Sequence, residues 1–135
     1  MNNYLINKAC IIDDDKLYIS LIKRIIEKDN LAKELLVFEN GKQAYAYFKE
    51  HIHDQKALPN IVLLDLNMPI MDGWEFLDVM EHHASELEKY GVTINVVSST
   101  INPVEVAKAT QHAIVNNFIT KPISKDAMID AFKVS

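Results

Sequence analysis

The sequence has few of the residues that cross-link, interrupt or anchor a polypeptide chain. Its 135 residues include one cysteine, Cys10, so no disulfide can form within the chain, which fits a reducing compartment. Three glycines and four prolines offer few places for a domain boundary. No apolar run approaches the roughly 18 to 20 residues of a membrane-spanning helix, and the N-terminus lacks the pattern of a signal peptide. We therefore expect one domain over residues 1–135, located in the cytoplasm, with no membrane association.

Basic charge is also scarce. The chain has 14 Lys and Arg against 19 Asp and Glu, a formal net charge of −5. Proteins that bind duplex nucleic acid usually carry a basic face, so we expect no nucleic-acid partner. The composition, 49% hydrophobic and 24% charged, is typical of soluble globular proteins, and the length suffices for a sizeable core.

Short apolar runs and amphipathic stretches alternate along the chain. The runs predict strands at residues 9–12, 35–38, 61–64, 92–97 and 117–120, of which 9–12 and 61–64 read as buried. Helical spacing predicts helices at residues 16–28, 43–50, 74–90, from 103 onward, and 125–133. We expect Val104, Ala107 and Ala113 to bury the fourth helix, and residues 51–60 to form a polar loop.

Strict alternation of five strands with five helices predicts an α/β fold. Such an order implies parallel strands, right-handed connections and helices on both faces of a doubly wound sheet. Ligands of these folds bind outside the carboxyl ends of the strands. Residues at those ends are therefore the first candidates for function.

Four of the five strand ends carry polar residues. The first strand ends in Asp13 and Asp14, the third in Asp65, the fourth in Ser98 and the fifth in Lys121. Three neighbouring carboxylates repel one another and need a cation, either Lys121 or a divalent metal. Hard oxygen ligands favour Mg²⁺, whereas the five histidines fall away from this edge and do not suggest zinc.

Each of these features has a simpler explanation when it is taken alone. An acidic triplet can cap a helix, an aspartate after a strand can form a turn, and a serine can cap the next helix. A lysine before a proline can be an ordinary surface residue. Their joint occurrence at four strand ends is hard to explain by chance.

Three segments together resemble the receiver domain of two-component response regulators. They are residues 11–15 (IIDDD), residues 63–73 (LLDLNMPIMDG) and the Lys121-Pro122 pair, and the resemblance covers nearly the whole chain. It implies a flavodoxin-like sheet of strand order 2-1-3-4-5 with five helices on both faces. The central segment is the most specific of the three.

The resemblance implies a role for each candidate residue. Asp65 resembles the phosphoacceptor, Asp14 the direct ligand of Mg²⁺ and Asp13 its partner, which often acts through water. Asp65 also belongs to the expected metal site, which the backbone carbonyl of Asn67 completes.

Four further residues match family positions. Ser98 resembles the hydroxyl residue that contacts the phosphoryl group, and Lys121 the lysine that pairs with a phosphoryl oxygen. Pro122 resembles the proline that follows a cis peptide bond. Phe118 has two equally supported interpretations, an aromatic switch that responds to Ser98 or a plain core residue.

The implied function is phosphoryl acceptance without enzyme activity beyond a possible autodephosphorylation. The expected donors are a sensor histidine kinase or a histidine phosphotransfer protein. The chain ends after the last predicted helix, so we expect no output domain. A downstream protein would then bind the face formed by the fourth helix, the strand 117–120 and the helix 125–133. The protein would be a monomer or a phosphorylation-dependent dimer.

The sequence supports several other functions to different degrees. The domain could be a phosphorelay shuttle, or a degenerate receiver that acts as a phosphorylation-independent interaction module. A phosphatase of the haloacid-dehalogenase type would need a second aspartate where Asn67 stands. A flavodoxin-like cofactor site would need a phosphate-binding loop where the acidic residues 13–15 stand.

Overall fold

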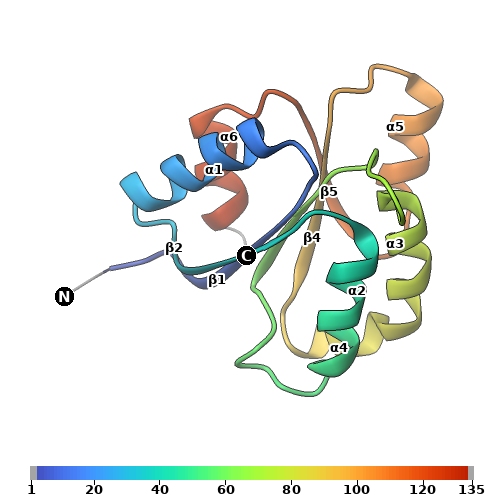
Figure 1. The fold of residues 1–135 in the computed structure, drawn as a ribbon, viewed down its shortest axis with the longest axis horizontal. Coiled ribbons are helices and arrows are strands. Elements are labelled where there is room, and N and C mark those ends of the chain that lie inside the picture. Colours follow the sequence, from blue (N-terminus) through green and yellow to red (C-terminus); the bar gives the residue numbers. More distant parts are fainter. Residues whose placement is uncertain (1–2, 134–135) are drawn as a thin grey trace.

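A computed structural model describes residues 3–133 of the chain and shows strands and helices in alternation (Figure 1). The strands are β1 (Ile6–Ile12), β2 (Ala32–Phe38), β3 (Ile61–Leu64), β4 (Thr93–Ser98) and β5 (Val115–Thr120). The helices are α1 (Lys16–Lys28), α2 (Gly41–Glu50), α3 (Gly73–Met80), the short 3₁₀ helix η1 (Glu81–His83), α4 (Ala84–Lys89), α5 (Pro103–Thr110) and α6 (Lys125–Lys133).

The five strands form one parallel sheet in the order β2-β1-β3-β4-β5. This confirms the predicted doubly wound architecture and its strand order. The chain moves outward from β1 to one edge and returns through β3 to the other, so the order reverses between β1 and β3. The carboxyl ends of these two strands therefore border the position where such folds bind their ligands.

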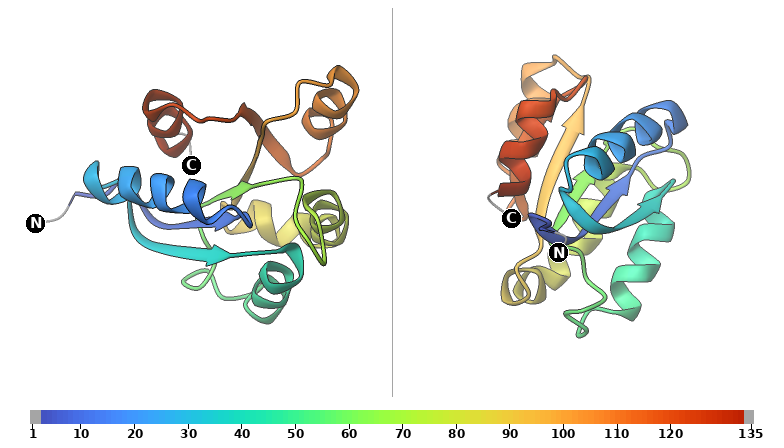
Figure 2. Two further views of the ribbon diagram at one scale, coloured as in Figure 1. Left: turned by 45° about the horizontal axis from the view of Figure 1, so that its top comes forward. Right: turned by 90° about the vertical axis from the view of Figure 1, so that its left-hand side faces the viewer.

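Two apolar clusters cover the two faces of the sheet. Successive side chains of a strand point to opposite faces, so Cys10 and Ile12 join one cluster while Ala9 and Ile11 join the other. The first cluster packs against α2, α3 and α4, with one residue from α5, and the second packs against α1 and α6. Figure 2 shows α1 and α6 together on one side of the sheet. The central strand β3 is buried along its whole length, as its continuous apolar run predicted.

The third predicted helix differs from the observed structure. The stretch expected as one helix over residues 74–90 is divided into α3, η1 and α4. The spacing of the buried Leu77, Met80 and Leu87 is compatible with an unbroken helix, so apolar periodicity gave no sign of the break. The local tightening at residues 81–83 changes the hydrogen-bond pattern without moving the apolar face.

The burial predicted for the fourth helix, α5, is wrong. Val104 is 75% exposed, and both Ala107 and Ala113 are exposed. Within α5, Ala109 alone is fully buried. Because α5 lies over the edge of the sheet beside β5, most of its circumference faces solvent (Figure 1).

The loop at residues 51–60 was expected to be polar, but it differs from that expectation because Ile52 and Leu58 are buried.

Candidate functional site

The backbone ties the candidate residues to one edge of the sheet. The Asp65 N–H donates a hydrogen bond to the Ile12 carbonyl at 2.9 Å, and the Asp13 N–H donates to Phe38 at 3.0 Å. The Lys121 N–H donates to the carbonyl of Ser98 at 2.9 Å. Each bond extends a strand ladder by one residue beyond the regular sheet. The sequence positions of the candidate residues therefore become fixed positions in space.

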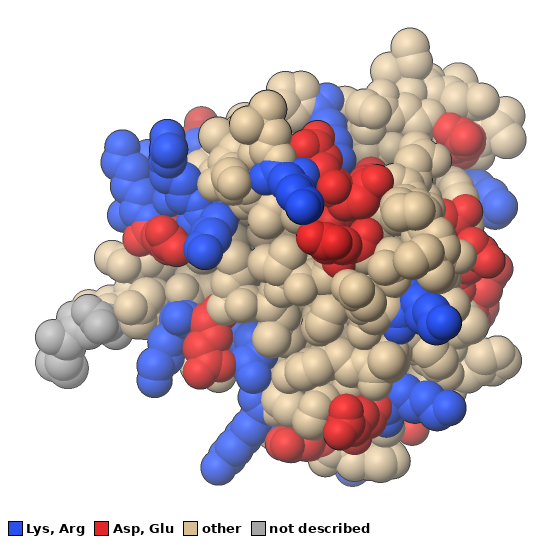
Figure 3. Space-filling view, in the orientation of Figure 1, with Lys and Arg blue, Asp and Glu red and all other residues tan. Residues whose placement is uncertain are grey.

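Three carboxylates lie together at this edge. Asp13, Asp14 and Asp65 each offer an oxygen within 4.8 Å of the others. Asp13 and Asp65 are buried, at 1% and 7% exposure, whereas Asp14 is exposed to solvent. Acidic side chains gather at this end of the molecule with a basic side chain beside them (Figure 3). The cluster is open to solvent on the side of Asp14.

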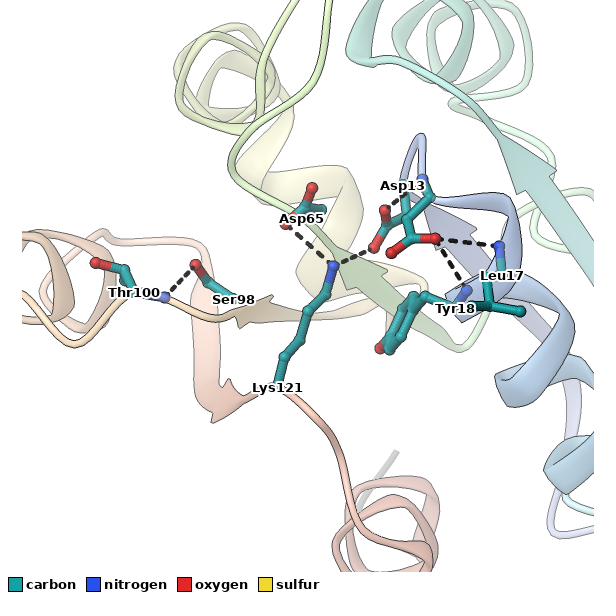
Figure 4. Close-up of polar contacts among 8 residues, drawn as sticks. Asp13, Leu17, Tyr18, Asp65, Ser98, Thr100 and Lys121 are labelled. Carbon is teal, nitrogen blue, oxygen red and sulfur yellow. Dashed lines mark hydrogen bonds and ion pairs between the residues drawn. The ribbon is translucent and has the colours of Figure 1, made fainter.

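Lys121 supplies the positive charge nearest to this cluster. Its ammonium nitrogen lies 2.8 Å from Asp13 Oδ2 and 3.5 Å from Asp65 Oδ1 (Figure 4). Burial lowers the pKa of Lys121, but the hydrogen bond and charge of Asp13, with the charge of Asp65, outweigh burial and raise that pKa. Lys121 is therefore charged, and it bridges two acids that come from different strands.

The Asp65 carboxyl is a weaker acid than an ordinary aspartate. Burial, followed by the charge of Asp13, raises the pKa of Asp65 to about 6 from its ordinary 3.8. Lys121 acts in the opposite direction and offsets only part of that rise. The carboxylate of Asp65 is thus ionised at neutral pH but lacks full compensation of its charge. This condition favours a further cation at the site.

The third acid of the triplet has a structural role. Asp15 is the N-cap of α1, and its carboxylate accepts hydrogen bonds from the amides of Leu17 and Tyr18, both at 3.1 Å. The Asp15 amide in turn donates to Asp13 Oδ1 at 2.9 Å. The simpler explanation, a helix cap, therefore holds for Asp15. It also orients Asp13, whose other oxygen binds Lys121.

The loop after Asp65 is closed by a glycine whose importance was missed in the sequence. A Cβ on Gly73 would lie 2.3 Å from the carbonyl oxygen of Asp65 and 2.7 Å from Leu66 Cα. No other residue fits without moving the backbone. Asp72 caps α3 in a capping box with Glu75, and the Gly73 N–H donates to the Leu66 carbonyl. A glycine in the first turn of a helix was the available signal for this close approach.

The remaining candidate residues lie around the carboxylates. Ser98 is fully buried, and its hydroxyl accepts a hydrogen bond from the Thr100 N–H at 3.2 Å. In Figure 4 this hydroxyl is turned toward Thr100 and away from Asp65. Phe118 on β5 is partly buried against the cluster on the α2 and α3 side. Asn67 is exposed in the loop after β3, and the peptide bond between Lys121 and Pro122 is cis.

Comparison with known proteins identifies the family to which this fold and this site belong. The family model of the response regulator receiver domain matches residues 9–133. This chain is a member of the response regulator receiver family. It is 29% identical over 126 residues to the chemotaxis protein CheY of Halobacterium salinarum, and the match covers 92% of each chain.

Solved receiver structures share the fold. A two-component response regulator from Cytophaga hutchinsonii superposes with a TM-score of 0.82 at 25% identity, covering 93% of both chains. The phosphorylated cyanobacterial phytochrome response regulator RcpA gives a TM-score of 0.74 at 26% identity, covering 94% of this receiver and 89% of RcpA.

Membership in the family sets the general character of the site. Receiver domains of two-component signalling are phosphoacceptors, and they bind a divalent metal at an acidic pocket; the Asp13, Asp14 and Asp65 cluster fits such a pocket. Within residues 3–133, no helix is both long and apolar enough to cross a membrane.

Proposed function

We propose that this receiver accepts a phosphoryl group on Asp65 and signals through phosphorylation-dependent contacts with other proteins. The observation that carries the proposal is the position of the Lys121 ammonium between Asp13 and Asp65, beside a third carboxylate that faces solvent. A nucleophilic carboxylate, a fixed cation and a set of oxygen ligands are the parts that phosphoryl transfer needs, because such transfer depends on positioning and charge neutralisation.

In the proposed reaction, an oxygen of Asp65 attacks the phosphorus of a phosphohistidine. The new O–P bond forms as the N–P bond breaks, and the imidazole leaves with the electron pair and takes up a proton. Lys121 offsets the negative charge on the phosphoryl oxygens. Water later attacks the acyl phosphate, which returns the carboxylate and releases inorganic phosphate.

The residues present fit a magnesium ion. All three side-chain donors are carboxylate oxygens, and burial and the charge of Asp13 raise the pKa of Asp65 more than Lys121 lowers it. Asp13, Asp14, Asp65 and the carbonyl of Asn67 would hold the ion. When bound, Mg²⁺ would neutralise charge that gathers on the phosphoryl oxygens.

Phosphorylation would give the hydroxyl of Ser98 a new acceptor. A phosphoryl group adds about one and a half to two negative charges and three strong acceptors. Ser98 now accepts a hydrogen bond from Thr100, so its hydroxyl proton is available to a new acceptor. Reorientation of Ser98 would loosen its bond to Thr100 and shift the loop after β4. Phe118, which is only partly buried, would follow if it is the aromatic switch.

The proposed phosphodonor is a sensor histidine kinase or a histidine phosphotransfer protein. The proposed output surface is the face of α5, β5 and α6, where Phe118, Pro122 and Ala127 help line a hollow of about 540 Å³. As a phosphorelay shuttle, the same site would pass its group to a second histidine. Residues 1–135 would act as one receiver in the cytoplasm, either monomeric or as a dimer formed on phosphorylation.

The test is intact mass after incubation with acetyl phosphate and Mg²⁺. Wild type should gain one phosphoryl group, and Asp65→Asn should gain none. Asp72→Asn is the matched control because Asp72 is a partly exposed helix cap and asparagine also caps helices. Removal of Mg²⁺ with a chelator should abolish the gain in wild type.

Two results would contradict the proposal. A mass gain that persists in Asp65→Asn would place the phosphoryl group elsewhere. Absence of any gain in wild type with Mg²⁺ present would instead favour a degenerate receiver that acts as an interaction module. Loss of the gain in Asp72→Asn as well would mean that the assay reports the fold and not the acceptor.

A further inference from the structure

Lys121 has a third partner besides its two carboxylates. Its ammonium nitrogen lies 4.3 Å from the centre of the Tyr18 ring. The negative face of an aromatic ring attracts a cation at this distance. Figure 4 shows the Tyr18 ring beneath the end of the Lys121 side chain, on the side of α1. Tyr18 comes from α1, whereas the two acids follow β1 and β3.

The Tyr18 ring is held firmly without using its hydroxyl. The side chain is buried, with 9% exposure, in the apolar cluster beneath α1 and α6. Its backbone amide donates to the N-cap Asp15, so the first turn of α1 fixes the start of the side chain. The Tyr18 hydroxyl is buried and has no hydrogen-bond partner among the described residues. The ring, and not the hydroxyl, is therefore the part of Tyr18 that contacts the site.

The ring differs from the carboxylates in what happens to it during the proposed reaction. Asp13 and Asp65 hold Lys121 in the free protein, but they are also proposed to hold a metal ion, and Asp65 to carry the phosphoryl group. A bound metal ion would weaken the attraction of both carboxylates for Lys121, and the phosphoryl oxygens would become a new partner of the ammonium group only after phosphorylation. The Tyr18 ring takes part in neither event, so its attraction for the ammonium group persists throughout.

We infer that Tyr18 is a positioning residue, whose ring face holds the Lys121 ammonium beside Asp65 when the carboxylates take other partners. This inference deepens the proposed function and rests on it for its activity measurement. It concerns a residue outside the acidic motif, and it assigns the role to the aromatic ring alone.

The test compares two substitutions, one that keeps the aromatic ring and one that replaces it with an apolar side chain that has no ring. Tyr18→Phe keeps the ring and removes a hydroxyl that has no partner, whereas Tyr18→Leu keeps an apolar side chain without a ring face. Tyr47→Leu is the control for lost aromatic packing. Tyr47 lies on α2, on the opposite face of the sheet, and its hydroxyl donates to the Ala57 carbonyl. Urea denaturation of each variant would establish that it is folded.

The first measurement needs no phosphodonor and is made with and without saturating Mg²⁺. Carbon-13 relaxation of the Lys121 ε-methylene reports the mobility of that side chain, with the resonance assigned by its loss in Lys121→Arg. With Mg²⁺, we expect Lys121 to be rigid in wild type, Tyr18→Phe and Tyr47→Leu, and mobile in Tyr18→Leu; without Mg²⁺, Asp13 and Asp65 should hold it in every variant. Equal rigidity of Lys121 in Tyr18→Leu with Mg²⁺, or equal mobility in Tyr47→Leu, would overturn the inference.

The second measurement is the rate of phosphorylation by acetyl phosphate with Mg²⁺. We expect Tyr18→Leu to slow this rate about three- to tenfold and Tyr18→Phe to stay within about twofold of wild type. Equal slowing in the two variants would show that the ring face is not responsible. If wild type itself gains no phosphoryl group, the proposed function fails, while the relaxation comparison still decides whether Tyr18 holds Lys121.

Discussion

Two loops border Asp65, and they are held by different kinds of contact. The loop from β3 to α3 is closed by backbone hydrogen bonds, from Gly73 to the Leu66 carbonyl and from Gly41 to the Met71 carbonyl, both at 2.9 Å. Leu66 and Met68 are also buried in the apolar cluster, so one side of the loop packs into the core. This loop cannot change shape without loss of packing.

The loop from β4 to α5 is held mainly through side-chain hydroxyls. The Thr100 amide donates a hydrogen bond to the Ser98 hydroxyl. The Thr100 hydroxyl forms a hydrogen bond with Glu105 and accepts one from the Asn102 amide. Ile101, at the tip, is 89% exposed. The comparison shows how one site can hold its nucleophile in place and still respond to it. The first loop fixes Asp65, and the second depends on a hydroxyl that a phosphoryl group could recruit.

The largest change in the free energy of unfolding should come from a side chain added at the tightly packed glycine of the first loop. Gly73→Ala places a methyl group 2.3 Å from the Asp65 carbonyl oxygen, so the backbone must move. We expect a loss of about 3 kcal/mol or more in the free energy of unfolding, measured by urea denaturation.

Gly91→Ala is the control for this prediction. Gly91 has a positive φ of 68° but nothing within 4 Å of an added Cβ, so it should lose only about 1 to 2 kcal/mol. An equal loss at the two glycines would mean that the first loop is not tightly closed.

The next largest change in the free energy of unfolding should come from the charge of Asp65, which the first loop follows. Asp65 has a folded-state pKa near 6 and an ordinary pKa of 3.8, so the folded protein binds a proton there more tightly than the unfolded chain does. Ionised Asp65 therefore destabilises the metal-free fold above pH 6, and this penalty disappears as the pH falls through 6 toward 3.8. Asp65→Asn should be more stable than wild type by about 1 to 3 kcal/mol at pH 8.

Urea midpoints of the two proteins between pH 8 and pH 5 would test this sign. The advantage of Asp65→Asn should shrink as the pH falls. Saturating Mg²⁺ should stabilise wild type and leave the variant almost unchanged, because only binding to the folded state adds stability. A variant that is less stable than wild type at pH 8 would show that the pairing with Lys121 outweighs the burial of the charge.

The topology of the sheet made the meeting of Asp13, Asp65 and Lys121 predictable. Parallel strands bring their carboxyl ends to one edge, so residues placed after an apolar run had to meet there. The contact of Tyr18 was not predictable in this way. Tyr18 lies at a helical position where any large apolar residue would fill the core, and only packing shows that its ring meets Lys121. The orientation of Ser98 likewise depends on a side-chain bond that strand patterns do not encode.

A smaller effect should come from strain in the first loop. Ile70 has a φ of 71°, a left-handed conformation that is unfavourable for a β-branched residue, and it is 73% exposed. Ile70→Asn should raise the free energy of unfolding by about 1 kcal/mol, because asparagine tolerates this conformation and little apolar burial is lost. Ile101→Asn is the matched control, since Ile101 is also exposed and does not have a positive φ. Equal changes in the two variants would argue against strain at Ile70.

The smallest global effect should come from the second loop, where the change is local. Thr100→Val keeps the shape of the side chain but removes the hydroxyl that bonds Glu105 and accepts from the Asn102 amide. Because these groups are exposed or partly exposed, the free energy of unfolding should change by less than about 0.5 kcal/mol. Amide hydrogen exchange at Asn102 should nevertheless accelerate about three- to tenfold, while exchange at Gly41 and Gly73 stays unchanged. Acceleration at all three amides would show that the two loops open together and that the hydroxyl network also supports the first loop.

Acceleration at Asn102 alone would mean that the second loop can rearrange while the backbone around Asp65 stays closed, which is the property that a phosphorylation switch requires.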